Sequence, residues 1–245
     1  MNLAKLSKRE PINSGIGLFS KKEGASLIAS GCPHVHSSIL GQKDSLVSLT
    51  MNSIKLKIPA VYPWEIAPMT KQLFLMSSKA RKKLIEEVLL GFNVKNSSST
   101  GDKIWTSLEE LLTNSIFHAY HDSNGKEKYR RNETAELLPE EKISIKFHRG
   151  SHGFFVSVQD FGQGLDFTKV SANFKRCYES SGLSQIESKE SGAGLGLYVV
   201  FELATHIKIV SQPGFGTVTS CWFATPSNFD PDHFSFNFFQ GAQKP

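Results

Sequence analysis

Three polar side chains recur four residues apart in the stretch 105–121, which reads WTSLEELLTNSIFHAYH. Glu110, Asn114 and His118 would share one stripe of an α-helix, because residues four apart lie on the same face. An amide oxygen is a hard ligand of the kind that Mg²⁺ takes alongside phosphate oxygens. A carboxylate one turn away can accept the proton of a hydroxyl or water that attacks a phosphate. The spacing favours phosphate chemistry, although an ordinary solvated stripe on an amphipathic helix fits the same residues.

A second candidate site lies at the end of a predicted strand, where Asp160 opens the sequence DFGQG. Its carboxylate can accept a hydrogen bond from an exocyclic amine such as N6 of adenine, a contact that contributes about 1.5–3 kcal/mol. Gly162 and Gly164 would let a planar base approach the backbone closely. Thr217, at the start of a later strand, would support Asp160 through its hydroxyl. The alternative is an Asx turn after a strand, which is common.

A glycine-rich turn, GAGLGL, precedes a helix predicted at 198–206. Its glycines, Gly192, Gly194 and Gly196, would expose backbone N–H groups to a phosphate at the start of this helix. A Rossmann turn does not fit, because the preceding stretch IESKES is not an apolar strand. The GK[ST] of a P-loop is absent from the sequence.

Two hairpins are expected to position these motifs. Residues alternate in character along 143–149 and 154–160, which a short glycine-bounded turn joins, and the second strand runs into Asp160. Strands at 206–212 and 217–225 form the closing hairpin. The stretch that carries Glu110 is expected to be a helix with Thr106 as its N-cap and Glu109 as the capping-box partner.

The segment upstream is predicted as a strand followed by a helix. Apolar residues alternate with lysines at the end of 46–58, which favours a strand, and apolar residues at helical spacing favour a helix over 64–92. A loop is expected at 95–102. Short strands are predicted at 15–20 and 25–30.

Two long polar segments are expected around the site. Residues 122–142 are interpreted as an exposed loop. Residues 166–191, with Lys175, Arg176 and Lys189, are predicted to form a lid over the phosphates, since a long connection inside a domain is usually functional.

Composition and charge distribution do not favour a nucleic-acid-binding function. The chain has 245 residues, 39% of them hydrophobic, which suffices for one large domain. The net charge is +5 and the pI about 9.0, but the basic residues are scattered. The densest clusters, 79–83 and 126–131, are interpreted as a helix face and a polar loop, so a nucleic-acid partner is not favoured.

Cysteine usage and hydropathy fit a cytoplasmic location. Cys32, Cys177 and Cys221 form neither a disulfide framework nor a CxxC pair. His34 and His36, close to Cys32, lack a zinc spacing. No apolar run approaches the roughly 18 residues of a membrane span, and the N-terminus lacks the apolar core of a signal peptide. No membrane association is expected.

In combination, the motifs resemble those of a known superfamily. ExxxN on a helix, DxGxG at a strand end, GxGLGL before a helix and a Gly-Thr that opens the last strand follow one another in the order typical of the gyrase, heat-shock chaperone, histidine-kinase and MutL (GHKL) ATPases. The resemblance covers residues 53–224. It implies an α/β sandwich of the histidine-kinase-type ATPase (Bergerat) fold, with a mixed sheet, helices on one face and ATP between the Glu110 helix and the lid.

Within this superfamily, EELLTNSIFHAY is similar to the EAxTNAxxHGY signature of bacterial anti-sigma-factor serine/threonine kinases. This resemblance implies that Glu110 is the general base and Asn114 the Mg²⁺ ligand. Asp160 would bind adenine with Thr217 in support. The other nucleotide-binding positions would be glycines and one leucine: Gly162, Gly164, Gly192, Gly194, Leu195 and Gly196. Ala119 departs from the signature, which has glycine there.

The domain division follows from the extent of the resemblance. It gives an N-terminal extension at 1–45, an ATP-binding domain at 46–225 and a Phe-rich tail at 226–245. The extension, the tail and the long 122–142 loop have no counterpart in the kinases. The tail's phenylalanines are expected to dock on the chain's own surface, because exposed aromatic patches are uncommon on monomers.

Two other functions are left open. A histidine-kinase catalytic domain usually has Asn in place of Glu110, and the His-acidic-x-x-Pro signature of its phosphoacceptor is absent from this sequence. A nucleotide-gated module would bind a partner without turnover. The partner implied by the resemblance is a sigma factor, an anti-anti-sigma-like regulator or a response regulator, and a homodimer is also left open.

Overall fold

The two predicted hairpins form the centre of one sheet. In the computed structural model, β4 (Ile143–Gly150) pairs with β5 (Gly153–Asp160), and β6 (His206–Gln212) pairs with β7 (Gly216–Ala224), all antiparallel. β5 and β7 pair with each other and place Asp160 opposite Thr217. The sequence prediction of both hairpins is confirmed.

Segments from both ends of the chain complete the sheet. The structure describes residues 14–38, 44–56, 59–66, 70–179, 195–225 and 233–241. Their eight strands have the order β1-β2-β8-β6-β7-β5-β4-β3. The outer strands are β1 (Ser14–Gly17), β2 (His34–Ser37), β8 (Phe234–Gln240) and β3 (Lys71–Leu75). Parallel pairs, β1 with β2 and β6 with β8, make the sheet mixed.

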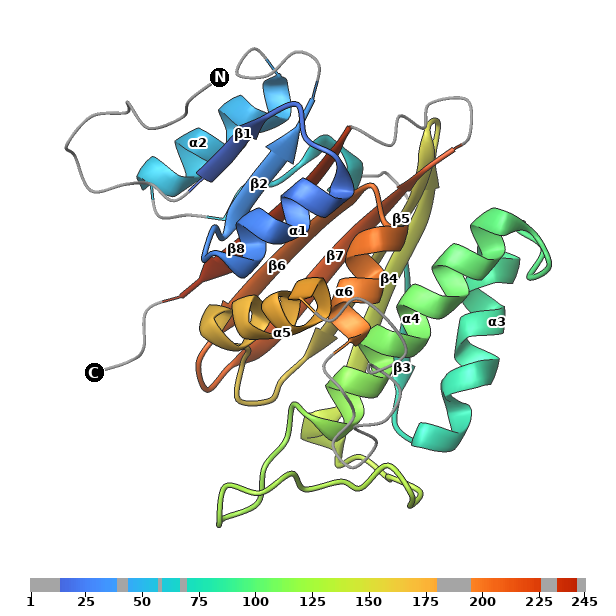
Figure 1. Cartoon of the computed structure of the whole chain (residues 1–245). Helices are drawn as coiled ribbons and strands as arrows, with labels where there is room; N and C mark the ends of the chain where they lie inside the picture. Colours follow the sequence, from blue (N-terminus) through green and yellow to red (C-terminus); the bar gives the residue numbers. More distant parts are fainter. Residues whose placement is uncertain are drawn as a thin grey trace.

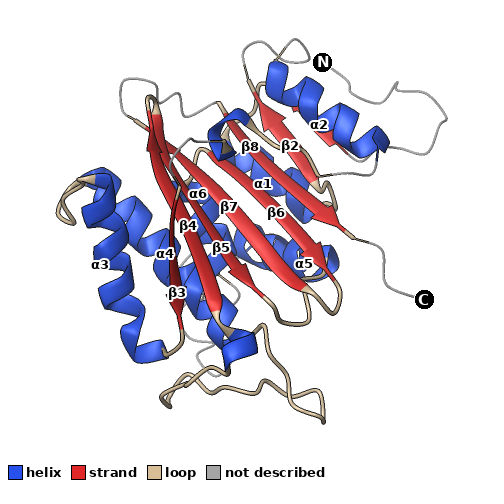
Figure 2. Ribbon diagram, turned by 180° about the vertical axis from the view of Figure 1, so that it is seen from behind, coloured by secondary structure: helices blue, strands red, loops and turns tan. Residues whose placement is uncertain are grey.

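Most of the described helices cover one face of this sheet (Figure 1). They are α1 (Lys21–Ala29), α3 (Arg81–Phe92), α4 (Ser99–Phe117), α5 (Phe167–Glu179) and α6 (Gly196–Leu203). Figure 2 shows the opposite face, where α2 (Ser45–Leu56) lies over the end formed by β2 and β8. Short 3₁₀ helices are η2 (Pro63–Glu65), η3 (Ser78–Ala80) and η4 (Pro139–Glu141). The predicted α/β sandwich with a mixed sheet is confirmed.

The helix that carries Glu110 begins earlier than predicted. Its N-cap is Ser98, whose hydroxyl accepts the N–H of Gly101 at 3.0 Å, so Thr106 is not the cap and 99–102 is not loop. The apolar face predicted for this helix is buried, with Ile104, Leu108 and Leu112 at most 1% exposed. The helix is therefore as expected in type and face, but it begins before residue 105 and ends at Phe117, four residues before the predicted end at 121.

The prediction of a strand at 46–58 is wrong, because α2 occupies this stretch and 57–58 lie outside the described residues. The Asp44 carboxylate accepts the N–H of Leu46 at 2.7 Å, a helix-start signal that the sequence analysis missed. Val47 and Thr50 are the buried positions of α2, and they lie at helical spacing. The alternation of apolar residues with lysines occurs on its exposed end and carries no burial information.

The helix predicted over 64–92 is present only as α3. The first part contains η2 and β3, because Lys71–Leu75 pairs antiparallel with β4, and local periodicity does not report such a pairing. In the N-terminal segment, 14–17 is a strand, but the strand predicted at 25–30 is the end of α1. Ser20 and Glu23 form a capping box that starts α1.

The Phe-rich tail docks on the chain itself, as predicted. Phe234, Phe236 and Phe238 of β8 are 1%, 0% and 3% exposed and belong to the main core. The ring of Phe236 packs against Phe174 of α5, and that of Phe234 packs against Phe201 of α6. Phe229 lies outside the described residues. The tail is thus part of the sheet that positions the site helices.

Buried histidines lie where α2 covers the sheet. His36 Nε2 lies 3.0 Å from both Asn237 Oδ1 and Thr50 Oγ1, and Thr50 Oγ1 lies 2.6 Å from the Tyr62 hydroxyl. His34 Nδ1 lies 3.3 Å from the same Asn237 oxygen. Burial lowers the pKa of His34 and of His36 to about 4. Both imidazoles are therefore neutral in the fold at pH 7.

This cluster predicts a loss of stability in acid. Between about pH 6.5 and 4 the unfolded chain binds protons at these histidines that the fold excludes, so the free energy of unfolding falls as pH falls. The slope should be about 1.4 kcal/mol per pH unit for each neutral histidine. Urea unfolding at pH 7.5, 6.0 and 5.0 measures it. His36→Gln should flatten the slope by about one histidine, and equal slopes in both proteins would contradict the assignment.

Candidate nucleotide-binding site

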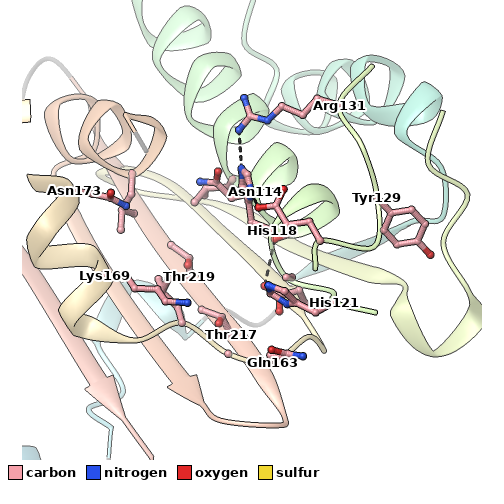
Figure 3. Close-up of a pocket in the computed structure, with 18 of the residues that line it drawn as sticks. Asn114, His118, His121, Tyr129, Arg131, Gln163, Lys169, Asn173, Thr217 and Thr219 are labelled. Carbon is pink, nitrogen blue, oxygen red and sulfur yellow. Dashed lines mark hydrogen bonds and ion pairs between the residues drawn. The ribbon is translucent and has the colours of Figure 1, made fainter. Parts of the chain in front are cut away.

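A cavity of about 950 Å³ lies between α4, α5, the strands β5 and β7, and the loop after α4. Figure 3 shows Asn114 of α4 and its C-cap residue His118 on one wall and Lys169, Thr217 and Thr219 on the other. The cavity is of the size that ligand pockets usually have. Four of the residues predicted from the sequence line it: Asn114, Asp160, Gly164 and Thr217.

Asp160 is the buried carboxyl group among the residues that line this cavity, with 7% of the residue exposed. The N–H of Gly162 donates to its Oδ1 at 3.1 Å, and the Ser115 hydroxyl lies 3.4 Å from its Oδ2. Burial raises the pKa of Asp160 to about 6, and hydrogen bonds from the backbone of Gly162 and Thr217 oppose this rise. The carboxyl is thus fixed in orientation and is ionised at neutral pH, as a partner for an amine donor should be.

The turn after Asp160 lies directly against the end of α4. The N–H of Gln163 donates to the Ala119 carbonyl at 2.9 Å, and a Cβ on Gly162 would lie 2.2 Å from that carbonyl oxygen. Gly164 has a φ of 85°, which favours glycine. Contact between the turn and α4 therefore requires Gly162, in addition to any close approach of a base.

Glu110 and Asn114 face the start of α6. An ideal Cβ on Gly196 would lie 2.4 Å from Glu110 Oε2 and 3.3 Å from Asn114 Nδ2, so a side chain at this position would displace the Glu110 carboxylate. Burial raises the pKa of Glu110, which is half-buried, and the nearby Arg131 guanidinium opposes the rise. Asn114 lines the cavity, whereas Glu110 lies just behind the wall.

The predicted lid is partly a helix. Residues 167–179 form α5, whose buried residues Val170, Phe174 and Cys177 lie three and four positions apart. The many polar residues between them concealed this apolar face in the sequence. Arg176 lines the cavity. Lys189, Gly192 and Gly194 fall outside the described residues, and Leu195 directly precedes α6.

Sequence reasoning assigned no role to the loop after α4, yet this loop forms one wall of the cavity. Lys126, Arg130 and Arg131 line it. Arg131 Nη2 lies 2.8 Å from His118 Nε2, and His118 Nδ1 lies 2.5 Å from Glu127 Oε1. The available signal was the basic cluster at 126–131, which was interpreted as a solvated loop.

Comparison with known proteins agrees with this geometry. Residues 100–227, from α4 to just beyond β7, match the family model of histidine kinase-, DNA gyrase B- and HSP90-like ATPases. The chain belongs to this ATPase family. Membership implies ATP binding, and the cavity framed by Asn114 and Asp160 is where this ATPase domain can hold the nucleotide. No curated protein matches the chain. Among its described helices, none is long and apolar enough to cross a membrane.

Asp160 should control ATP affinity in this ATPase. Asp160→Asn removes the negative charge and should weaken ATP binding roughly 10- to 150-fold, the range expected for a charged hydrogen bond. Calorimetry measures the change. Because burial disfavours the Asp160 carboxylate, the variant should not lose thermal stability at pH 7.

Asp102→Asn is the matched control, because Asp102 is exposed in the first turn of α4 and is not among the residues that line the cavity. It should bind ATP like the wild type. Unchanged ATP affinity in Asp160→Asn would refute the adenine-binding role.

Proposed function

We propose that this chain is a regulatory Mg-ATP-dependent serine/threonine kinase of the anti-sigma-factor type that acts on a protein partner. The observation that supports it is the pair formed by Glu110 and Asn114 on one face of α4, against the glycine that starts α6. A carboxylate in this position suits transfer to a hydroxyl, because a neutral hydroxyl must lose a proton as it attacks.

Glu110 is suited to be the base. Burial raises its pKa, which increases its affinity for a proton compared with an exposed carboxylate. In phosphoryl transfer most of the catalysis comes from positioning and charge neutralisation, and the base contributes typically ~10²–10⁴-fold. Asp160 would hold the adenine, so that the phosphates extend toward Asn114 and the start of α6.

Mg²⁺ fits the donor set of this wall. The Asn114 amide oxygen is a hard donor of the kind that Mg²⁺ takes together with nucleotide phosphates. Among the described residues, no group of three or more His, Cys, Asp or Glu side chains could hold a metal ion. The ion would therefore be held jointly by Asn114 and the phosphates, and it would supply charge neutralisation there.

A nucleotide-gated binding module is the second candidate, and one observation favours it. Glu110 lies against Gly196 and is not among the residues that line the cavity. An acceptor hydroxyl held in the cavity would not contact Glu110 in this arrangement. Without that contact, the chain would bind ATP and a partner, such as a sigma factor or an anti-anti-sigma-like regulator, without turnover.

Glu110→Gln separates these functions. The change keeps size and hydrogen bonding but removes the base, so turnover should fall about 10²–10⁴-fold while ATP affinity stays nearly constant. The assay is transfer of labelled phosphate to a partner captured with ATP. Glu109→Gln, one residue away and paired with Arg81 at 2.7 Å, is the matched control and should turn over normally.

The outcomes distinguish the candidate functions. Wild-type turnover in Glu110→Gln would show that Glu110 is not the general base. Absence of turnover in the wild type with every captured partner would favour the binding module. Phosphate on a histidine, which is labile in acid and stable in base, would identify a histidine kinase that acts on a separate phosphoacceptor.

A further inference from the structure

The wall made by residues 121–133 is a folded element. The Asp122 carboxylate accepts the N–H groups of Asn124 at 2.8 Å and Lys126 at 3.0 Å. His121 and Glu127 form a β-bridge, and the N–H of Lys128 donates to the Tyr120 carbonyl at 2.9 Å. This segment, named here the basic wall, therefore has a defined backbone conformation beside the cavity.

The basic wall shares its anchor with the Asp160 turn. The Glu141 carboxylate accepts hydrogen bonds from Lys128 Nζ at 2.6 Å and from the Tyr129 hydroxyl. The Tyr120 hydroxyl donates to the Glu141 carbonyl at 2.8 Å and accepts the N–H of Phe161 at 3.3 Å. Phe161 directly follows Asp160, so these contacts fix the wall and the base-binding turn relative to each other.

Arg131 is a cation of this wall that lines the cavity and is held by a hydrogen bond to the C-cap residue of α4. A guanidinium can only donate, so His118 Nε2 must accept the hydrogen bond from Arg131 Nη2. His118 Nδ1 then carries the proton and donates to Glu127 Oε1. Glu127 thus selects the tautomer of His118 that can hold Arg131. Figure 3 shows the Arg131 side chain reaching over His118 toward α4.

Depth in the cavity indicates which part of a nucleotide meets Arg131. Asp160 is buried, whereas Arg131 is exposed at the rim. Asp160 contacts Ser115, one residue after Asn114, whereas the Arg131 charge acts on the Glu110 carboxyl, one helical turn before Asn114. A nucleotide whose base reaches Asp160 and whose phosphates pass Asn114 toward the start of α6 would therefore bring its outermost phosphate toward Arg131.

We propose that Arg131 binds the terminal phosphate of a nucleoside triphosphate, and that His118 and Glu127 are positioning residues for it. The chain would then distinguish ATP from ADP through an arginine supplied by the basic wall. An arginine suits this role because its guanidinium forms paired hydrogen bonds to phosphate oxygens. The proposal rests on the nucleotide site described above and adds to it the recognition of the third phosphate.

Calorimetry with MgATP and MgADP tests the proposal. Arg131→Ala should weaken MgATP binding roughly 10- to 100-fold and MgADP binding less than about threefold, because only ATP has the third phosphate. Arg131→Lys should recover part of the loss, since it restores the charge but not the paired geometry. Lys146→Gln removes the same charge from an exposed position on the sheet face opposite the cavity and should change neither affinity.

A double-mutant cycle tests the positioning role. Glu127→Ala should weaken MgATP binding about 3- to 10-fold in the wild type and have no effect on it in Arg131→Ala, because it acts only through the arginine. An effect of Glu127→Ala that is the same in both backgrounds would show a general structural role and overturn this part.

The outcomes separate this proposal from the proposed function. If the wild type binds MgATP and Arg131→Ala keeps the wild-type ratio of ATP to ADP affinity, the role of Arg131 is refuted and the nucleotide site stands. If the wild type binds neither nucleotide, the nucleotide site itself is refuted, and the role of Arg131 with it.

Discussion

The contact between the Asp160 turn and the end of α4 is the constraint on which the site depends. A buried carboxylate is costly unless it is hydrogen-bonded, and Ser115 of α4 and the Gly162 N–H supply these bonds. Gly162 lies so close to the Ala119 carbonyl that no side chain fits. The sheet and α4 therefore have one relative position at this contact. The same contact fixes the position of Asn114, one residue before Ser115, relative to the Asp160 carboxyl.

The N-terminal extension and the Phe-rich tail stabilise α6. Lys21 of α1 donates to the carbonyls of Phe201 and Ala204 at 2.5 and 2.7 Å, and so caps the C-terminal end of α6. Its ammonium also lies 4.4 Å from the Phe201 ring centroid and 4.7 Å from that of Phe234. The start of this same helix faces Glu110 and Asn114. Lys21 and Phe234, which lie outside the residues matched to the ATPase family, thus fix the helix whose start faces this pair.

These contacts join three walls that all lie within the residues matched to the ATPase family. α6 is held from outside that region by Lys21 of α1 and Phe234 of β8, and the basic wall lies between α4 and β4. The Tyr120–Glu141 network connects the basic wall to the Asp160 turn without passing through the sheet. The positions of the basic wall and of the turn that follows Asp160 are therefore coupled through Tyr120.

The sequence by itself determined the motifs, their order and the central hairpins, because alternation and glycine-rich turns are local signals. It also predicted the helix of Glu110 and the face that this helix buries. Only the tertiary structure decided that Lys71–Leu75 is a strand, since its partner lies in β4, far along the chain. The tertiary structure likewise decided where the basic cluster at 126–131 lies. No local sequence pattern distinguishes a solvated arginine from one that is held by His118 beside a cavity. Local patterns report periodicity, whereas pairing and placement depend on contacts between residues distant in sequence.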